Sequence, residues 1–244
     1  MKYLIVYFHT SSMTKFAHIQ YLLRRHPVRL RLLHSNRGYP ELQERSRLSL
    51  QSGAEYLRQK SGFAMPFILE DTEVYIEAYR QQGGISYPGF DVKRWWRVTS
   101  FEEIDAKCKK AGTRAASQTS NICLSVPGLA PAFFKGRVAG EISKTLEKIE
   151  ENPETPWLNG RDFGSIFVPK SARLPFGALP LEESLRFDFR RLAVDKLVAR
   201  IVEINSLLNL DPNCYRTDEN DSSLDQLNLF GIEYDFFSEA TEEC

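Results

Sequence analysis

The first third of the chain alternates short apolar runs with amphipathic segments. Residues 2–8 (KYLIVYF) are typical of a buried strand, and residues 28–33 (VRLRLL) alternate like a strand with one polar face. Apolar residues at helical spacing predict one helix from about Met13 to Arg25 and another from about Leu48 to Lys60. Residues 66–70 follow as a third strand. This β-α-β-α-β order predicts a layered α/β fold.

The third predicted strand runs directly into two adjacent carboxylates, Glu70 and Asp71, within PFILEDTEVYIEAY (66–79). We interpret the residues that follow, TEVYIEAY, as a helix-like turn. Ligands of α/β folds gather at the loops that leave the strand ends, so the two acids suit a metal or catalytic site. The alternative is a strand that reaches solvent, with Asp71 or Thr72 capping a helix.

The rest of the chain predicts an antiparallel addition to the sheet. Residues 115–126 and 130–143 are interpreted as two strands joined by a turn that contains Pro and Gly. Residues 151–160 have the Pro, Asn and Gly content of a loop, and a short strand at 165–169 comes after them. A long helix is expected from about Leu181 to Leu208. No break in composition indicates two independently folding domains.

The net charge of zero conceals an asymmetry. Residues 211–244 contain ten acidic residues and one basic residue, so they carry −9 and residues 1–210 carry +9. A basic body suits an anionic ligand, and an acidic tail can screen or dock on that body. The alternative is a solvated, poorly ordered C-terminus, but residues 224–237 (LDQLNLFGIEYDFF) are rich in large apolar residues. We therefore expect a ligand-binding domain at residues 1–210 and an acidic tail, a candidate docking segment, at residues 211–244.

Other features narrow the class of protein. The four cysteines have no paired spacing, and the first nine residues form too short an apolar run for a secretory signal. No stretch approaches the roughly 20 apolar residues that cross a bilayer, so we expect a cytoplasmic protein without membrane contact. The arginines between residues 24 and 37 lack interleaved aromatic residues, so no nucleic-acid partner is expected. The four histidines lack ligand spacing and are interpreted as structural or surface residues.

The loop after the first strand is a candidate phosphate site. Neither GxxxxGK[ST] nor GxGxxG occurs in the chain. The loop instead carries the hydroxyls of Thr10, Ser11 and Ser12, with Lys15 one turn later. Hydroxyls and backbone N–H groups at a helix start, beside a lysine, suit a phosphate group. Capping of a helix by Ser or Thr gives the same pattern, so the loop alone does not decide between them.

Six sequence blocks, taken in order, resemble the inosine triphosphate pyrophosphatase family, which converts ITP, dITP and XTP to monophosphate and pyrophosphate. The blocks are TSSMTK (10–15), ILEDT (68–72), YPGFDVKRWW (87–96), FFKGRVAGEI (133–142), RDFGSIFVP (161–169) and EES…FDFRRLA (182–193). The resemblance covers about residues 1–205. It implies an elongated mixed β-sheet with flanking helices, two lobes around a nucleotide cleft, and usually a homodimer.

The resemblance also assigns roles to individual positions. The residues at phosphate-binding positions are Thr10, Ser12, Lys15, Lys93 and Arg190, and those at base-binding positions are Asp162 and Phe163. Asp71 falls on the family's essential acid, which binds Mg²⁺ or activates the attacking water. Glu70 beside it and Glu41 or Glu44 upstream correspond to further metal ligands.

Several family residues are replaced in this chain. Ser52 and Ser184 stand where lysines are expected, Ser12 stands where an asparagine is usual, and FDFRR (187–191) retains Arg190 but has no histidine. RDFGSIFVP lacks the aromatic–Asp pair that reads the purine. Removing one such contact typically lowers the rate by about 10²–10³.

The sequence therefore predicts a protein that binds ITP, dITP or XTP with Mg²⁺ and hydrolyses it weakly. Such a protein is suited to sensing, and members that resemble it act in anti-phage defence beside a sirtuin-like NAD-degrading effector. Two alternatives remain. One is an active (d)ITP/XTP pyrophosphatase, and the other is a scaffold subunit without a ligand.

Overall fold

The computed structural model describes residues 4–33, 46–59, 62–80 and 87–207. Its strands are β1 (Leu4–His9), β2 (Val28–Leu33), β3 (Phe67–Ile76), β4 (Pro88–Gly89), β5 (Ala115–Ser125), β6 (Ala132–Ile142) and β7 (Phe167–Pro169). Its helices are α1 (Met13–Leu23), α2 (Ser46–Gln59), α3 (Val92–Val98), α4 (Phe101–Ala111), α5 (Leu181–Ser184) and α6 (Phe189–Leu207). Glu41, Glu44 and the predicted acidic tail lie outside the described residues.

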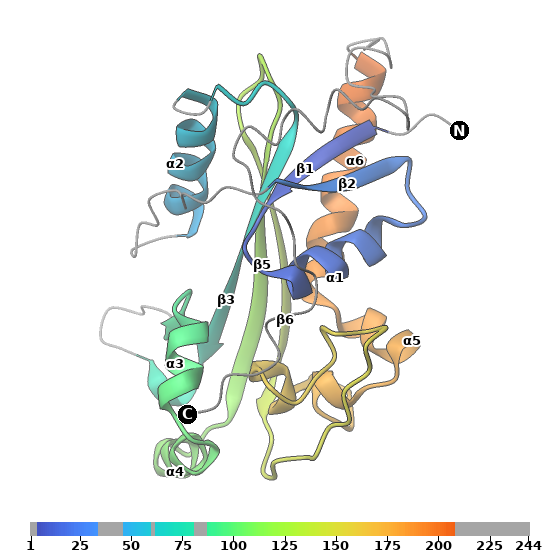
Figure 1. The fold of residues 1–244 in the computed structure, drawn as a ribbon. Helices are drawn as coiled ribbons and strands as arrows, with labels where there is room; N and C mark the ends of the chain where they lie inside the picture. The colour runs from blue at the N-terminus through green and yellow to red at the C-terminus, as the bar shows by residue number, and fades with distance from the viewer. Residues whose placement is uncertain (1–3, 34–45, 60–61, 81–86, 208–244) are drawn as a thin grey trace, which may run out of the picture.

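These strands form one mixed sheet in the order β2-β1-β3-β5-β6-β7, with β4 also paired to β3. The β1 strand pairs in parallel with both β2 and β3, whereas β3, β5, β6 and β7 pair antiparallel in turn. Figure 1 shows that β3, β5 and β6 are long and form the spine of the molecule. The predicted α/β fold with a mixed sheet and flanking helices is therefore confirmed.

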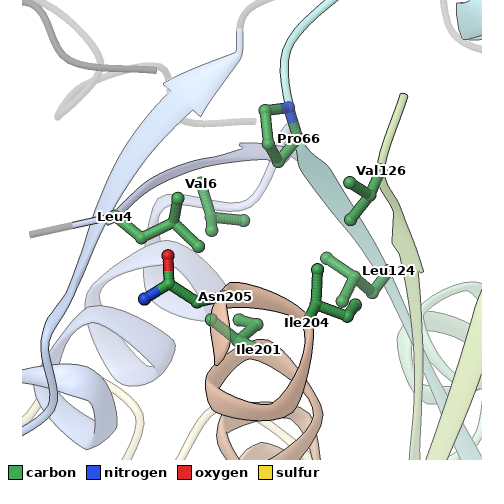
Figure 2. Close-up of a pocket in the computed structure, with 8 residues that line it drawn as sticks. All are labelled: Leu4, Val6, Pro66, Leu124, Val126, Ile201, Ile204 and Asn205. Atoms are coloured by element: carbon green, nitrogen blue, oxygen red, sulfur yellow. The ribbon is translucent and has the colours of Figure 1, made fainter. Parts of the chain in front are cut away.

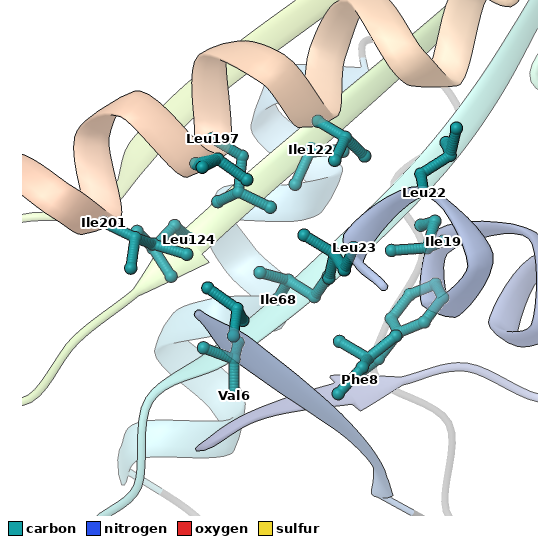
Figure 3. Packing of buried hydrophobic residues seen from close by; sticks show 14 of the residues in the cluster. Val6, Phe8, Ile19, Leu22, Leu23, Ile68, Ile122, Leu124, Leu197 and Ile201 are labelled. Carbon is teal, nitrogen blue, oxygen red and sulfur yellow. The ribbon is translucent and has the colours of Figure 1, made fainter. Parts of the chain in front are cut away.

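Helices cover both faces of one end of this sheet. Helices α1 and α6 bury one face, where Val6, Ile68 and Ile122 meet Leu23 and Leu197 (Figure 3). Helix α2 covers the opposite face through Leu50, Ala54 and Leu57, which pack against strands β1 and β3. Burial of these apolar side chains from both sides explains why β1 has an almost continuous apolar sequence.

A separate apolar cluster forms at the other end of the long strands. It combines Val74 and Ile76 of β3 with Trp95 of α3, Ile104 of α4 and Phe167 of β7. In Figure 1 α3 and α4 lie at the lower end of the spine, while α2 and most of α6 lie at its upper end. The long strands therefore connect two groups of packed elements, and the middle of β3 lies between them.

Strand β3 is longer than the sequence predicted. It does not end at Glu70; it continues to Ile76, and only residues Glu77–Tyr79 form a turn of 3₁₀ helix. The helix-like interpretation of residues 72–79 was wrong. Threonine, valine, tyrosine and isoleucine in this stretch favour an extended chain, and β3 pairs with β5 along its whole length. Glu70 and Asp71 therefore lie in the middle of a strand.

Some of the other predictions of secondary structure are confirmed and some are wrong. Strand β2 has the predicted bounds, and β5 and β6 form the predicted hairpin. The single long helix expected from residue 181 to 208 is wrong, because the chain leaves the helical conformation at Asp188 and α6 starts at Phe189. Helices α3 and α4 were not predicted. No helix within the described residues is long and apolar enough to cross a membrane.

Helix α6 lies very close to β6 because Gly136 has no side chain. A Cβ atom at this position would stand 2.0 Å from the carbonyl oxygen of Phe189 and 2.6 Å from the backbone nitrogen of Ala193. The glycine therefore sets the distance between the start of α6 and the sheet. That distance places Arg190 directly over the middle of β3, where the candidate site is found.

Candidate functional site

The candidate site is built around the buried carboxylate of Glu70 in β3. The Nζ atom of Lys15 lies 3.0 Å from its Oε2 atom, and the Nε atom of Arg190 lies 3.3 Å from its Oε1 atom. The hydroxyls of Ser120 and Thr72 donate to Oε1 at 2.8 Å and 3.0 Å. One carboxylate therefore joins the beginning of α1, two central strands and the beginning of α6.

Local structure fixes the two cations. Ser12 caps α1, since its hydroxyl accepts a hydrogen bond from the backbone nitrogen of Lys15, and Thr10 in turn accepts from the nitrogen of Ser12. Asp188 caps α6 in the same way and accepts from the backbone nitrogen of Arg190 at 2.9 Å. The hydroxyls predicted to bind phosphate are thus the residues that orient the first turn of α1.

The electrostatics of Glu70 follow from this arrangement. Burial by itself raises the pKa of a carboxyl group, but the charges of Lys15 and Arg190 outweigh burial and hold the pKa of Glu70 at about 2. The carboxylate is therefore ionised at neutral pH. It balances one of the two cations and leaves a net charge of about +1 among these three side chains.

His18 and Asp188 form a buried pair that contacts Arg190. The Nε2 atom of His18 lies 2.6 Å from Oδ2 of Asp188, and its Nδ1 atom lies 3.3 Å from Nη1 of Arg190. The indole of Trp157 stacks on the imidazole at 4.6 Å, with the rings nearly parallel. Burial raises the pKa of Asp188, but the partner His18 lowers it further, so the net shift is downward. His18 is part of α1 and lies 170 positions away from Asp188 in the sequence.

Asp71, the predicted essential acid, points away from this cluster. Adjacent residues of a strand face opposite sides of the sheet, so β3 does not present Glu70 and Asp71 as a pair. Asp71 is half-buried and lies opposite Asn121 of β5, which lies opposite Lys135 of β6. No group of three or more His, Cys, Asp or Glu side chains that could hold a metal occurs among the described residues.

The predicted base-binding residues have different environments. Phe163 is buried in the lower apolar cluster, where its ring stacks on Phe167 at 5.7 Å and meets Trp96 edge-on. The Asp162 carboxylate accepts a hydrogen bond from the nitrogen of Gly164. Asp162 is exposed to solvent, and desolvation by the surrounding protein raises the pKa of its carboxyl group. As described, Asp162 is open to a ligand and Phe163 is not.

The remaining predicted positions lie apart from Glu70. Lys93 is exposed on α3, beside the far end of β3. Ser184 is buried, and its hydroxyl donates to the carbonyl of Leu181 within its own helix. The structure thus brings Lys15 and Arg190 together at Glu70, with Thr10 and Ser12 in the turn before Lys15, and leaves Lys93 apart.

Two hollows of the surface do not include any of the predicted site residues. A groove of about 370 Å³ lies between α1 and the segment around residues 153–157, with Tyr21, Arg24 and Trp157 in its walls. A small notch of about 10 Å³ is lined by apolar side chains of β1, β5 and α6 (Figure 2). Trp157 therefore separates the groove from the buried His18 on which it stacks.

His18, Trp157 and Asp188 were missed as parts of the site. His18 and Asp188 are 170 positions apart in sequence, and no local spacing connects them. The one available signal was the FDF stretch (187–189). There the acid Asp188 stands immediately before α6, at a position where the resemblance leads us to expect a different polar residue. Ser120 and Thr72 gave no signal because hydroxyls are frequent in strands of this type.

Comparison with known proteins gives a family and a fold. The family model of the Ham1 family matches residues 6–200. The Ham1 protein of Staphylococcus aureus is 16% identical and aligns with a TM-score of 0.63 over 82% of this chain and 98% of that one. A HAM1 protein from Coxiella burnetii is 18% identical, with a TM-score of 0.57 over 82% and 99% of the two chains.

A third solved structure carries the name of an activity. It is the nucleoside-triphosphatase, or dITP/XTP pyrophosphatase, of Mycobacterium abscessus, which is 17% identical with a TM-score of 0.56 over 80% of this chain and 97% of that one. At such identities these structures establish a shared fold. No curated protein sequence matches the chain.

Proposed function

Since the chain belongs to the Ham1 family, we propose that it binds a purine nucleoside triphosphate such as ITP, dITP or XTP together with Mg²⁺, and hydrolyses it slowly or not at all. The substrate class is that named for one structural relative, the dITP/XTP pyrophosphatase of Mycobacterium abscessus. The observation that carries the proposal is the meeting of Lys15 and Arg190 at Glu70.

The geometry around Glu70 supports anion binding. Lys15 and Arg190 come from opposite ends of the matched region, and two cations within hydrogen-bond distance of one carboxylate are arranged as they would be around a phosphate. The side chain of Lys15 is 25% exposed, so it can reach a ligand from solvent. In this proposal a phosphate group takes over part of the contact that Glu70 now makes.

The residues present fit a magnesium ion that enters with the nucleotide. Mg²⁺ is usually bound through one or two carboxylates, with the substrate phosphates and water supplying the remaining ligands. Glu70 is the carboxylate that lies beside Lys15 and Arg190 and meets that requirement, whereas Asp71 faces the other side of β3. When bound, Mg²⁺ neutralises phosphate charge and helps orient the attacking water. Glu70 would hold the ion, and Lys15 and Arg190 would orient the phosphates.

The same geometry supports slow hydrolysis. Transition-state charge on a transferring phosphorus is stabilised by cations that are not already neutralised. Here the Glu70 carboxylate balances one of the two cations that meet at it. Ser184, where the family has a lysine, is buried and bonded within its own helix turn, so it adds no charge. Binding tolerates these losses better than catalysis, because binding does not depend on charge that develops only in the transition state.

Slow turnover would keep the nucleotide bound for long periods. A protein that changes state with occupancy and does not destroy its ligand is suited to a sensor. In this proposal the chain reports the nucleotide to a protein partner, and the acidic tail is the segment through which it acts. Active pyrophosphatase chemistry is the competing outcome, and the experiment below distinguishes the two.

The proposal is tested by calorimetry on the full-length protein with dITP, in the presence and absence of Mg²⁺. We expect binding that requires Mg²⁺ and weakens at least tenfold in Lys15→Met. The matched control is Lys110→Met, which removes an exposed lysine on α4 far from Glu70 and should bind as the wild type does. Glu70→Gln should remove most of the dependence on Mg²⁺, whereas Asp71→Asn, on the other face of β3, should retain it.

Each result is informative. If the wild-type protein does not bind dITP, ITP or XTP, the proposal is wrong. If Lys15→Met and Glu70→Gln both bind like the wild type, a site exists but its placement is wrong. Pyrophosphate release measured on the same samples then separates a slow binder from an active enzyme.

A further inference from the structure

Strand β2 is an edge of the sheet. Its inner side pairs with β1 from Val28 to Leu33, and within the described residues no strand pairs with its outer side. An unpaired edge presents a row of backbone N–H and C=O groups that can accept another strand. The edge is six residues long and has no proline within it.

The side chains of β2 alternate in chemistry as well as in direction. Val28, Leu30 and Leu32 share the face covered by α1 and α6, where Val28 and Leu30 are part of the apolar cluster. Arg29 and Arg31 point to the other face, and Arg29 is exposed. A strand added to this edge would therefore need apolar side chains on one face and acidic side chains on the other.

The chain contains one such sequence. Residues 232–236, in the tail outside the described part of the structure, read IEYDF. Large apolar residues at 232, 234 and 236 alternate with Glu233 and Asp235. This is the two-residue period of a strand with one apolar and one acidic face.

The two alternations match whichever way the added strand runs. Because the side-chain period is two, pairing Tyr234 with Leu30 places Glu233 and Asp235 opposite Arg29 and Arg31 in both parallel and antiparallel directions. Reversing the direction of the added strand only changes which acid lies opposite which arginine. Opposite charges at directly paired positions are favourable, and a slip by one residue would place acids beside the apolar face.

The tail begins close enough to reach this edge. Figure 2 shows Leu4 of β1 beside Asn205 near the end of α6, and Leu4 pairs with Val28 of β2. About 25 residues separate Leu207 from residue 232, and a segment of this length spans about 25–30 Å on average. Neighbouring strands are only about 4.8 Å apart, so the segment can reach the edge from its own chain.

At the other end of the sheet, β7 pairs only with Gly140–Ile142 of β6, and the rest of the outer side of β6 is less available than β2. Strand β6 also carries alternating basic residues, Lys135 and Arg137. Its backbone is partly occupied, however. The side chain of Lys196 donates a hydrogen bond to the carbonyl oxygen of Lys135, and the backbone nitrogen of Lys170 donates one to the carbonyl oxygen of Ala139. Side-chain and loop contacts of this kind are a common way to block an edge.

From these observations we propose that residues 232–236 add to the outer edge of β2 as a strand, within the same chain. Backbone hydrogen bonds hold the segment, and the contacts of Glu233 and Asp235 with Arg29 and Arg31 set its register. In this arrangement the acidic tail occupies the basic edge of its own chain. A partner protein that binds the tail would have to compete with β2 for it.

Hydrogen exchange of the full-length protein tests this proposal. In the wild type we expect slow exchange at residues 28–33 and at residues 231–237. The tail variant E233R/D235R should exchange at least tenfold faster in both segments, and so should the edge variant R29E/R31E. Combining the two should restore slow exchange, because the charges are opposite again. The matched control K135E/R137E makes the same charge change on β6 and should leave both segments slow.

A proline substitution in the tail tests the same pairing without changing any charge. Tyr234→Pro removes one backbone donor from the middle of the segment and should also accelerate exchange at residues 28–33. If residues 231–237 exchange rapidly in the wild type, or if the tail variants leave residues 28–33 unchanged, the proposal is wrong. Protection that depends on protein concentration, together with a dimer in light scattering, would assign the edge to a second copy and overturn docking within one chain.

Discussion

Replacing Glu70 by glutamine isolates the charge at the centre of the site. The amide has nearly the same shape as the carboxylate and can still accept hydrogen bonds from Ser120 and Thr72. It cannot balance Lys15 and Arg190, which lie 3.0 Å and 3.3 Å from the Glu70 oxygens. The substitution therefore leaves two neighbouring cations without their counter-ion while keeping the packing of the strand.

The expected cost can be obtained in two ways. Lowering the pKa of Glu70 from 4.5 to about 2 corresponds to about 3 kcal/mol of stabilisation of the folded protein at neutral pH. Removing one member of a buried ion pair typically costs about 3–5 kcal/mol. Because the side chain of Lys15 is 25% exposed, solvent screens its share, and we expect the lower end, about 3 kcal/mol.

The effect should depend on pH in a defined direction. A carboxyl group whose pKa is lowered by folding stabilises the protein above its ordinary pKa, and this stabilisation is lost as the pH falls through the folded value. For Glu70 the loss occurs between about pH 4.5 and pH 2. Urea unfolding at pH 7 should therefore separate wild type and Glu70→Gln by about 3 kcal/mol, and the gap should narrow as the pH falls toward 2.

The matched control is Glu73→Gln, which changes a half-buried glutamate on the opposite face of the same strand. It should shift the free energy of unfolding by less than about 0.5 kcal/mol. A cost of Glu70→Gln below about 1 kcal/mol at pH 7, or an equal gap between wild type and Glu70→Gln at pH 7 and pH 3, would contradict this role of Glu70.

Three further substitutions test the supports of the site, each by chemical denaturation. Gly136→Ala should cost about 3 kcal/mol or more, since its Cβ would meet the carbonyl of Phe189 at 2.0 Å and push α6 outward; wild-type stability would contradict the close packing. Asp188→Asn should cost about 2 kcal/mol at pH 7, and the difference should disappear in acid because folding lowers the pKa of Asp188. Trp157→Ala should cost about 3–5 kcal/mol by uncovering His18, and a loss below 1 kcal/mol would contradict the stacked arrangement.

The fold was largely predictable because its signals are local. The apolar run of β1 and the alternation of β2 are properties of a few adjacent residues, and they gave the parallel part of the sheet. Strand β3 was cut short because two acids in a buried strand resemble its end. Its length is set by ten pairings with β5, which are contacts over about 50 positions that local periodicity does not contain.

The site was only partly predictable, for the same physical reason. Lys15 and Arg190 were identified by their place in an ordered series of motifs, and the structure does bring them together. The sequence could not indicate that Glu70 neutralises them, because side-chain direction in a strand depends on register. It also could not pair His18 with Asp188, since that contact depends on how α1 packs against α6.

We propose that this Ham1-family chain holds a purine nucleoside triphosphate without efficient hydrolysis. The most direct measurement is pyrophosphate release from dITP by the full-length protein, with Mg²⁺ and with occupancy of the site verified by calorimetry. Enzymes typically turn over about 10 times per second, and losing one charge-stabilising contact costs about 10²–10³, so we predict less than about 0.1 s⁻¹. Saturable release at about 1–10³ s⁻¹ would contradict the account and identify the chain as an active pyrophosphatase.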